Sequence, residues 1–348
     1  VKSIEKDAVI SRPSRERRGN IDRSKLSQIP QYLGQIVGLA KLEIYGWLTR
    51  LDGSSKWKKL DKNDKIIQKQ APWGLARISE SRPYRTKYTY HKSAGAGSCV
   101  YIIDSGVDAH HPEFQGRVKR LMDLYPNSDN KICGHGTHIA GIIGSTKYGV
   151  AKKTTIFDVK VENDKGETTV SKIVEGIDFI TKDIPSRNCP KGIVVQISPY
   201  QASEAIKEAI KRLLTKQAFV VVGAGDKGML VPEEYRAASS HFSIVGAIQK
   251  GDKFSVYSNY GPLVDLLAPG TAILSTWPGG GTKILSGTAM ASAHVAGLGA
   301  YLLGLDQNSI SLDQYMAVTG RYDVVDLGLR KQSQTNSVLI NNRLAAFD

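Results

Sequence analysis

Two kinds of segment alternate along residues 70–348, and this alternation most constrains what the chain can fold into. Apolar runs of strand length stand at SCVYIIDSG (98–106), TTIFDVKV (154–161), GIVVQIS (192–198) and AFVVVGAG (218–225). Between them, Thr169–Ile180 and Glu204–Leu214 carry apolar residues at helical spacing. Strand–helix–strand repeats predict an α/β fold with a mostly parallel central sheet and helices on both faces. Ligand sites in such sheets lie at the carboxyl ends of strands, so we expect Asp104 and Asp226 near each other.

The N-terminal part has a different character. The net charge of the 348 residues is +14, and residues 1–70 hold 16 basic and 8 acidic residues, a net +8. No aromatic platform or recognised motif accompanies the basic runs, so we expect a solvated or cleavable segment and no nucleic-acid partner. Residues 11–69 are predicted to form a basic insertion or linker without a hydrophobic core, and their composition is compatible with disorder.

Length and composition limit the other classes of protein to which this chain could belong. No apolar run is long enough to cross a membrane, so we expect a soluble protein that does not associate with a membrane. No segment of signal-peptide type opens the chain, so any such signal is expected to have been removed or to lie outside this sequence. The three cysteines, Cys99, Cys133 and Cys189, lack metal-ligand spacing and leave one disulfide and one free thiol open for a secreted protein.

Three motifs carry candidate chemistry: YIIDSGVD (101–108), GHGTHIAG (134–141) and SGTAMASAHVAG (286–297). An Asp at a strand end orients an imidazole, a His at a glycine-flanked helix start acts as general base, and a small residue at another helix start faces both. Taken alone, Asp104 would be an ordinary turn residue at the end of a strand, and His135 would be an ordinary helix cap. His135 and His138 form an HxxH pair, but no third ligand has suitable spacing, so zinc is not expected.

The order of these motifs resembles the subtilisin family, and specifically its proteinase K-like fungal subfamily. The motifs that carry the resemblance are QAPWGLARIS (70–79), SAGAGSCVYIIDSGV (93–107), HPEFQGR (111–117), YGVAKKT (148–154), RNCPKG (187–192) and SNYG (258–261). The resemblance implies a three-layer subtilisin-like domain over residues 70–348, Asp104 as the orienting carboxylate and His135 as general base. It also implies a secreted, extracellular serine endopeptidase that acts on peptides or proteins.

The chain departs from that family where catalysis is most sensitive. Ala289 stands at the position of the nucleophilic Ser, whose loss in subtilisin itself lowers turnover by roughly 10⁶. Ser286 and Ser292 each lie three residues away and out of place to substitute. Asp226 stands where the family has an Asn that donates to the oxyanion, and an ionised carboxylate would repel that charge. Some convertases of the superfamily carry Asp there, so this position alone does not exclude activity.

The substrate cleft differs as well. The resemblance places Gly166 and the segment Ser198, Pro199, Tyr200 and Gln201 in the cleft, where the family has Ser-Leu-Gly-Gly. Tyr200 and Gln201 would put side chains where glycines leave the specificity pocket open. Ala293 replaces a Pro in the helix that starts near Ala289. Random sequence drift in a protein that keeps its fold would also account for these changes.

Supporting sites follow from the same resemblance. It implies a disulfide between Cys99 and Cys189, leaves Cys133 free, and places Ser243 at one position of a second disulfide that this chain lacks. It also implies a structural calcium ion at Asp265, whose alternative is an ordinary strand-end Asp. No other cofactor is expected.

Val1–Ile10 resembles the last strand of an inhibitory propeptide, which makes residues 11–69 an insertion or a translated intron. RERR (15–18) is a dibasic pattern that a kexin-like protease could cut. We therefore expect a monomeric serine endopeptidase homologue that is inactive as written. Two alternatives stay open: an active endopeptidase whose Ser was replaced by engineering, and a pseudoprotease that binds peptides or protease inhibitors.

Overall fold

The structure is a computed structural model in which the placement of most, but not all, of the chain is described. The described residues are 7, 9–11, 64–80, 82–126, 133–198, 200–236 and 241–305, with positions 312, 316, 320, 321, 324–328, 339 and 340. The chain divides into one unit of Val1–Arg12 with Lys65–Asp348 and another of Pro13–Asp64. Apart from Asp64, the second unit lies outside the described residues, and the RERR pattern lies there too.

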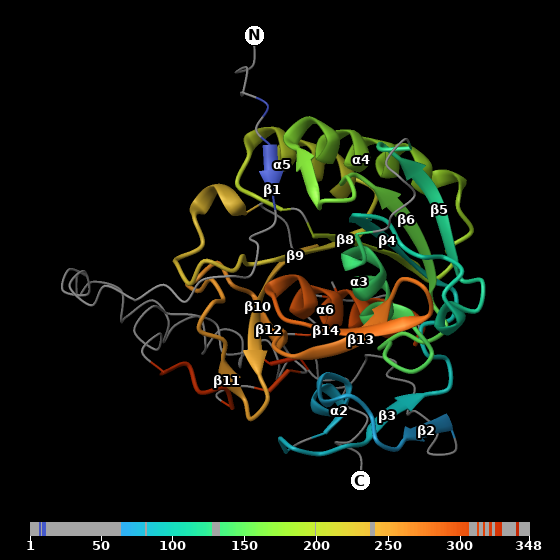
Figure 1. The fold of residues 1–348 in the computed structure, drawn as a ribbon, viewed down its shortest axis with the longest axis vertical. Coiled ribbons are helices and arrows are strands. Elements are labelled where there is room, and N and C mark those ends of the chain that lie inside the picture. The colour runs from blue at the N-terminus through green and yellow to red at the C-terminus, as the bar shows by residue number, and fades with distance from the viewer. Residues whose placement is uncertain are drawn as a thin grey trace, which may run out of the picture. The chain divides into compact units, whose positions relative to one another are not determined.

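A mostly parallel sheet forms the centre of the larger unit, as the sequence predicts (Figure 1). Its described strands run in the order β11-β10-β9-β8-β4-β6-β5, with β12 beside β10, and all pairings are parallel except β10 with β11. Their bounds are β4 Ser98–Asp104, β5 Val118–Asp123, β6 Thr155–Lys160, β8 Gly192–Ile197, β9 Phe219–Gly223, β10 Phe242–Gln249, β11 Lys253–Phe254 and β12 Leu266–Pro269. The four apolar runs of the sequence become β4, β6, β8 and β9.

Helices cover both faces of this sheet and make a three-layer α/β fold (Figure 1). One face carries α4 (Val170–Asp183) and α5 (Glu204–Leu214), whose apolar stripes join the core that lies under them. The other carries α3 (His135–Gly144) and α6 (Thr288–Leu303). None of the helices in the described part of the chain combines the length and apolar character that crossing a bilayer requires.

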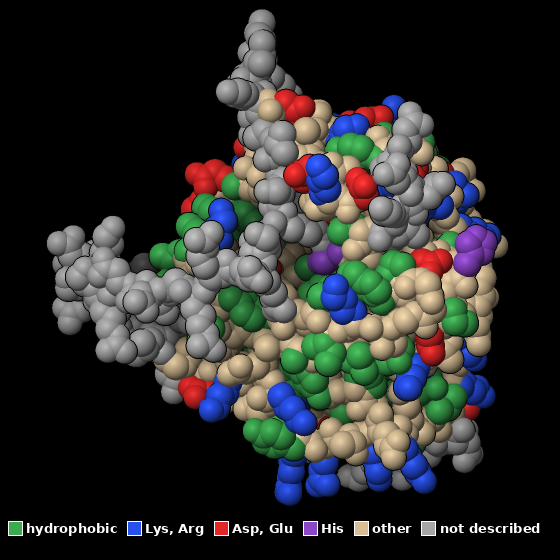
Figure 2. Space-filling view, viewed as in Figure 1, with side chains coloured by type: hydrophobic (Ala, Val, Ile, Leu, Met, Phe, Trp, Pro, Cys, Tyr) green, Lys and Arg blue, Asp and Glu red, His purple; other side chains and the backbone are tan. Residues whose placement is uncertain are grey.

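Shorter elements surround the sheet. The helix α2 spans Trp73–Ser79, and 3₁₀ turns stand at Pro112–Phe114, Ile184–Ser186 and Glu233–Tyr235. Three antiparallel pairs are β1 (Val9–Ser11) with β7 (Glu167–Thr169), β2 (Lys65–Gln68) with β3 (Tyr88–His91), and β13 (Ile273–Trp277) with β14 (Gly281–Leu285). Hydrophobic side chains with few charges among them lie over the region of β13 and β14, while Lys and Arg gather near α2 and β3 (Figure 2).

Strand β2 precedes Gln70, the residue at which the peptidase domain is predicted to begin from the sequence. It belongs to the larger unit because its four residues pair in register with β3. Ile67 of this strand is 57% exposed, so burial does not mark the strand in a charged stretch of sequence. Of the segment Val1–Ile10, the structure describes Asp7, Val9 and Ile10.

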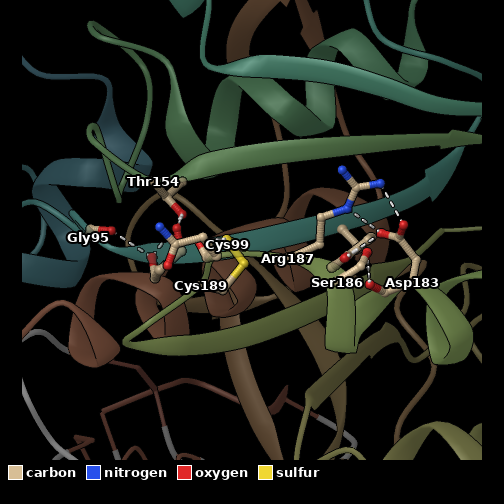
Figure 3. Close-up of a disulfide and its surroundings, with 10 residues drawn as sticks. Gly95, Cys99, Thr154, Asp183, Ser186, Arg187 and Cys189 are labelled. Atoms are coloured by element: carbon tan, nitrogen blue, oxygen red, sulfur yellow. Dashed lines mark hydrogen bonds and ion pairs between the residues drawn. A yellow bond between two sulfur atoms is a disulfide. The ribbon is translucent and has the colours of Figure 1, made fainter.

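A disulfide joins Cys99 on β4 to Cys189 in the loop before β8, which confirms the pairing that the resemblance implies (Figure 3). Beside it, Arg187 forms an ion pair with Asp183, and the Tyr101 hydroxyl donates to the same carboxylate at 2.8 Å. Cys133 is outside this bond. The bridge spans a sequence separation of 90 residues, so it excludes many open conformations of the unfolded chain.

Replacing both cysteines (Cys99→Ala with Cys189→Ala) should lower the free energy of unfolding by about 4–5 kcal/mol, the chain-entropy value for a loop of this size. Denaturation in guanidinium chloride measures the change. Cys133→Ala is the matched control, because it removes a thiol without opening a loop. An effect of the double replacement no larger than that of the control would contradict the prediction.

Candidate active site

A buried carboxylate and a histidine form the centre of the site. Asp104 is the last residue of β4 and is fully buried, and its Oδ2 lies 2.9 Å from Nδ1 of His135, the first residue of α3. Its Oδ1 accepts the Ser105 N–H at 2.6 Å and lies 3.1 Å from the same His135 nitrogen. A proton on Nδ1 facing the carboxylate leaves Nε2 as an acceptor, which is the state that a general base requires.

Two glycines allow α3 to start this close to β4. A Cβ on Gly136 would lie 2.5 Å from the carbonyl oxygen of Gly106, so any side chain there would push the helix away from Asp104. Gly134 has φ +88°, and a Cβ on it would lie 2.4 Å from the ring of Trp277. The glycine flanks of His135 are therefore a steric requirement of the Asp104–His135 contact.

His138 points away from this pair and joins α3 to the β13–β14 hairpin. Its Nε2 lies 3.0 Å from the Ile273 carbonyl oxygen and 3.1 Å from that of Lys283. Burial lowers the pKa of His138 to about 4, so the ring is neutral near pH 7. Within the described ranges, no three His, Cys, Asp or Glu side chains are placed to hold one metal ion.

The start of α6 carries a methyl group at the position that the resemblance assigns to the nucleophile. Ala289 is half-buried in the first turn of the helix and offers no oxygen. Ser292 is buried; its hydroxyl donates to the Ala289 carbonyl at 2.9 Å and accepts from Gln196 Nε2 at 3.2 Å. Ser286 Oγ accepts the Ala272 N–H. Both nearby serines are thus engaged in structural hydrogen bonds.

Asp226 follows β9 and caps α6 from outside the helix. Its Oδ1 accepts the N–H of Thr288 at 2.8 Å, across 62 residues of sequence. The Thr288 hydroxyl in turn accepts the Gly225 N–H at 3.0 Å. A helix N-terminus stabilises negative charge, so a carboxylate is a favourable cap there. The resemblance places the oxyanion of a reacting carbonyl at this position, where a carboxylate would repel it.

Tyr200 and Ser198, which the resemblance places in the substrate cleft, bond residues of the fold. The Tyr200 hydroxyl donates to the Tyr235 carbonyl at 2.6 Å, and Ser198 Oγ lies 2.9 Å from Gln196 Nε2. Gln201 is half-buried, and Pro199 lies outside the described residues. Gly166, with φ +76°, comes directly before β7, whose edge is paired with β1.

Asp265, which the resemblance makes a calcium ligand, already has two partners. Its Oδ1 accepts from Arg236 Nη2 at 2.5 Å, and its Oδ2 accepts the Ile244 N–H at 2.8 Å. Arg236 also donates to the Leu263 carbonyl at 3.1 Å. A guanidinium therefore supplies the positive charge at this carboxylate, and the residues present do not fit a calcium ion.

A buried Asp–His pair at the carboxyl edge of a parallel sheet is the arrangement that orients the base of a triad hydrolase. The Subtilase family (peptidase S8) matches residues 95–324. Proteinase T of Parengyodontium album is 48% identical over 79% of this chain and 94% of its own length. Proteinase R of the same organism is 48% identical over 70% of this chain, and the match covers 63% of the length of proteinase R.

A solved structure shows the same similarity in three dimensions. The crystal structure of a cold adapted subtilisin-like serine proteinase superposes with a TM-score of 0.68 at 31% identity, over 78% of this chain and 98% of the other. The chain belongs to the subtilase family, and its fold is subtilisin-like. The sequence analysis missed the partners of three candidate site residues: Thr288 for Asp226, Tyr235 for Tyr200 and Arg236 for Asp265.

Acid should destabilise the protein through His138. The pKa of this ring is about 4 in the folded chain and 6.5 in the unfolded chain, so below about pH 6.5 the unfolded state binds the proton first. Stability should therefore fall as the pH decreases from about 6.5 to 4. His138→Gln keeps an N–H donor near the Ile273 carbonyl but does not titrate. The free energy of unfolding of the His138→Gln variant should depend on pH less steeply than that of the parent protein, by about 1.4 kcal/mol per pH unit. Equal slopes in urea denaturation across this range would disprove the assignment.

Calcium should not stabilise the protein through Asp265. We expect the same unfolding temperature in excess calcium and in excess chelator, because Arg236 occupies the carboxylate. Arg236→Met should lower that temperature and expose Asp265 to added calcium. Asp265→Asn is the control. A calcium-dependent rise in the parent protein that Asp265→Asn abolishes would show that the ion displaces Arg236.

Proposed function

We propose that the chain as written is a non-hydrolytic member of the subtilase family that binds peptide segments in its cleft. The observation that carries the proposal is the pairing of an intact Asp104–His135 contact with Ala289 at the nucleophile position. The base and its orienting carboxylate remain, but no oxygen is available to attack a carbonyl. An acyl-enzyme cannot form without that oxygen.

Asp226 adds a second obstacle to hydrolysis. Catalysis of acyl transfer depends on donors aimed at the developing oxyanion, and here the nearby side chain is an acceptor bound to the Thr288 N–H. The two losses act on different steps: Ala289 prevents attack, and Asp226 disfavours the charge that attack would produce. Binding of a neutral peptide requires neither step.

The N-terminal segment supports a cleft of this kind. Strand β1 pairs antiparallel with β7, next to Gly166, and both carboxylate oxygens of Asp7 bond Ser171 at the start of α4. We interpret Val1–Ile10 as a remnant of an inhibitory propeptide, of which β1 pairs with the edge of β7. Without a nucleophile the protein does not cut this segment free, so a peptide ligand competes with β1 for the edge of β7.

Partners and compartment follow as parts of the same proposal. The family points to peptide or protein ligands and to protease inhibitors that recognise the cleft, with the protein acting as a monomer. A disulfide forms and persists in an oxidising environment, which supports secretion. The proposal includes no nucleic-acid partner.

An active serine endopeptidase whose Ser was replaced by Ala is the second candidate. The undisturbed geometry of Asp104 and His135 favours it, because the base is already oriented for a serine at position 289. The two candidates differ in whether Asp226 and the segment Ser198–Gln201 still permit catalysis once a hydroxyl is restored.

Restoring the hydroxyl separates these candidates. Ala289→Ser, refolded with an inhibitory propeptide in trans, should react slowly with a fluorophosphonate probe, and the chain as written should not react. Adding Asp226→Asn should raise the rate of peptide hydrolysis by about 10²–10³, the range known for the corresponding amide in subtilisin itself. His135→Ala in the Ala289→Ser background is the control and should abolish labelling.

Full peptidase activity of Ala289→Ser alone would contradict the proposal and favour the engineered alternative. Titration calorimetry of the chain as written with a peptide library tests binding directly. Absence of binding across that library would reject the peptide-binding role.

A further inference from the structure

A hollow in the surface beside α2 lies outside the candidate active site. Its lining includes Trp73 and Arg77 of α2, Tyr84 and Arg85 of the turn that follows, and Lys250 and Gly251 after β10. Its volume is about 220 Å³, and it is open to solvent. Pockets for whole small molecules usually start near roughly 300 Å³, so this hollow fits one group of a larger ligand. Helix α2 and strand β1 lie at opposite ends of the larger unit (Figure 1), so such a ligand would leave the edge of β7 accessible.

Positive charge dominates the lining of the hollow. Among the described residues, its lining includes Arg77, Arg85 and Lys250 but no Asp or Glu. Arg77 is buried, and its Nε and Nη2 donate to the two carboxylate oxygens of Asp252 at 2.6 and 3.1 Å. Arg85 and Lys250 are exposed, and neither forms an ion pair with a carboxylate that the structure describes. Two uncompensated cations therefore meet the solvent at this hollow.

A further guanidinium stands near Arg77. The charge of Arg77, after burial as the larger cause, lowers the pKa of Arg321, and the charge of Asp252 raises it. Nε of Arg321 is buried and has no hydrogen-bond partner in the described part of the chain. Two guanidiniums thus face the one carboxylate of Asp252, so this carboxylate has no spare charge for Arg85 or Lys250.

Tyr84 adds an exposed aromatic ring to these cations. Its φ is +66°, in the left-handed region that is costly for a bulky residue. The residue is 67% exposed, so burial does little to offset this cost. Lys250 Nζ lies 5.9 Å from the ring centroid, and the Tyr84 hydroxyl would overlap any Cβ on Gly251. Backbone strain at an exposed residue that folding does not require points to a role in binding.

We propose that this hollow binds an acidic polysaccharide, with Arg85 and Lys250 on a sugar-ring carboxylate and Tyr84 against the ring. A guanidinium matches the geometry of a carboxylate with two parallel hydrogen bonds. Arg82 and Lys87 are exposed on the same segment and are available to further charges of the polymer, in the region where Lys and Arg gather (Figure 2). Sites for single-stranded nucleic acid stack several successive bases, whereas Tyr84 offers one exposed ring. The site is independent of the proposed peptide cleft.

The first experiment measures binding to the full chain as written. A fluorophore-labelled oligogalacturonate and a neutral galactan oligomer of the same length are titrated and followed by fluorescence anisotropy. We expect the charged oligomer to bind more tightly by a factor on the order of 10 or more, and its affinity to fall as salt is added. Equal affinity of the neutral oligomer overturns the proposal without any variant having to fold.

Two variants place the binding at the hollow. Arg85→Ser with Lys250→Ser should weaken oligogalacturonate binding by a factor on the order of 10, because both charge pairs are lost. The matched control is Lys119→Ser with Lys216→Ser, which removes the same charge from exposed lysines elsewhere and should bind as the parent does. Equal weakening in the two double variants would show that net charge alone attracts the polymer, and would overturn the site.

Tyr84→Gly separates binding from folding. Glycine suits a φ of +66°, so this variant should keep or raise the unfolding temperature, measured by circular dichroism, while it loses affinity for oligogalacturonate several-fold. An unchanged affinity would remove Tyr84 from the site and overturn the assignment to a sugar ring. A single-stranded oligonucleotide of the same length that displaces the oligogalacturonate at much lower concentration would identify the partner as nucleic acid, and would overturn the polysaccharide assignment.

Discussion

The close packing of α6 against the central sheet is the constraint on which the site depends. Glycine and alanine make up much of this helix, and all its residues from Thr288 to Leu302 except Ala289 are buried. A Cβ on Gly299 would lie 3.1 Å from the Phe219 ring, and one on Gly297 would lie 2.9 Å from Val150. Larger residues would lift the helix from the sheet. Its first turn, which carries Ala289, would then be displaced.

The same packing explains why the site can lose its chemistry and keep its shape. The position of Ala289 is set by the buried length of α6, and that of His135 by the glycines against Gly106 and Trp277. Neither depends on a hydroxyl at position 289. The Asp104–His135 contact is also shielded from water on the Asp104 side, so the hydrogen bond persists as a structural interaction. Loss of the nucleophile therefore removes a reaction step without removing a packing contact.

The sequence predicted the parts of the fold that repeat locally and missed those that join distant segments. Strands β4, β6, β8 and β9 and helices α4 and α5 follow from apolar periodicity, and the Asp104–His135 pairing and the disulfide follow from motifs with strong family precedent. The pairing of β1 with β7 joins residues far apart in the chain, and β2 is too short and too exposed to show a pattern. Cap formation by Asp226 escaped prediction because helix caps are sought within a few residues of the helix start, and this one comes from a strand end.

The departures from the family differ in how deeply they are built into the structure. Asp226 accepts the first N–H of α6, and Tyr200 exchanges hydrogen bonds with Tyr235. Each of these residues has a partner on another element, so each contributes to packing as well as altering the site. Ala289 is the exception, since its methyl group gains no contact of that kind. A single engineered replacement would explain Ala289, but it would leave the departures at Asp226 and Tyr200 unexplained. The contacts that hold these two residues support the proposed binding role over an interrupted protease.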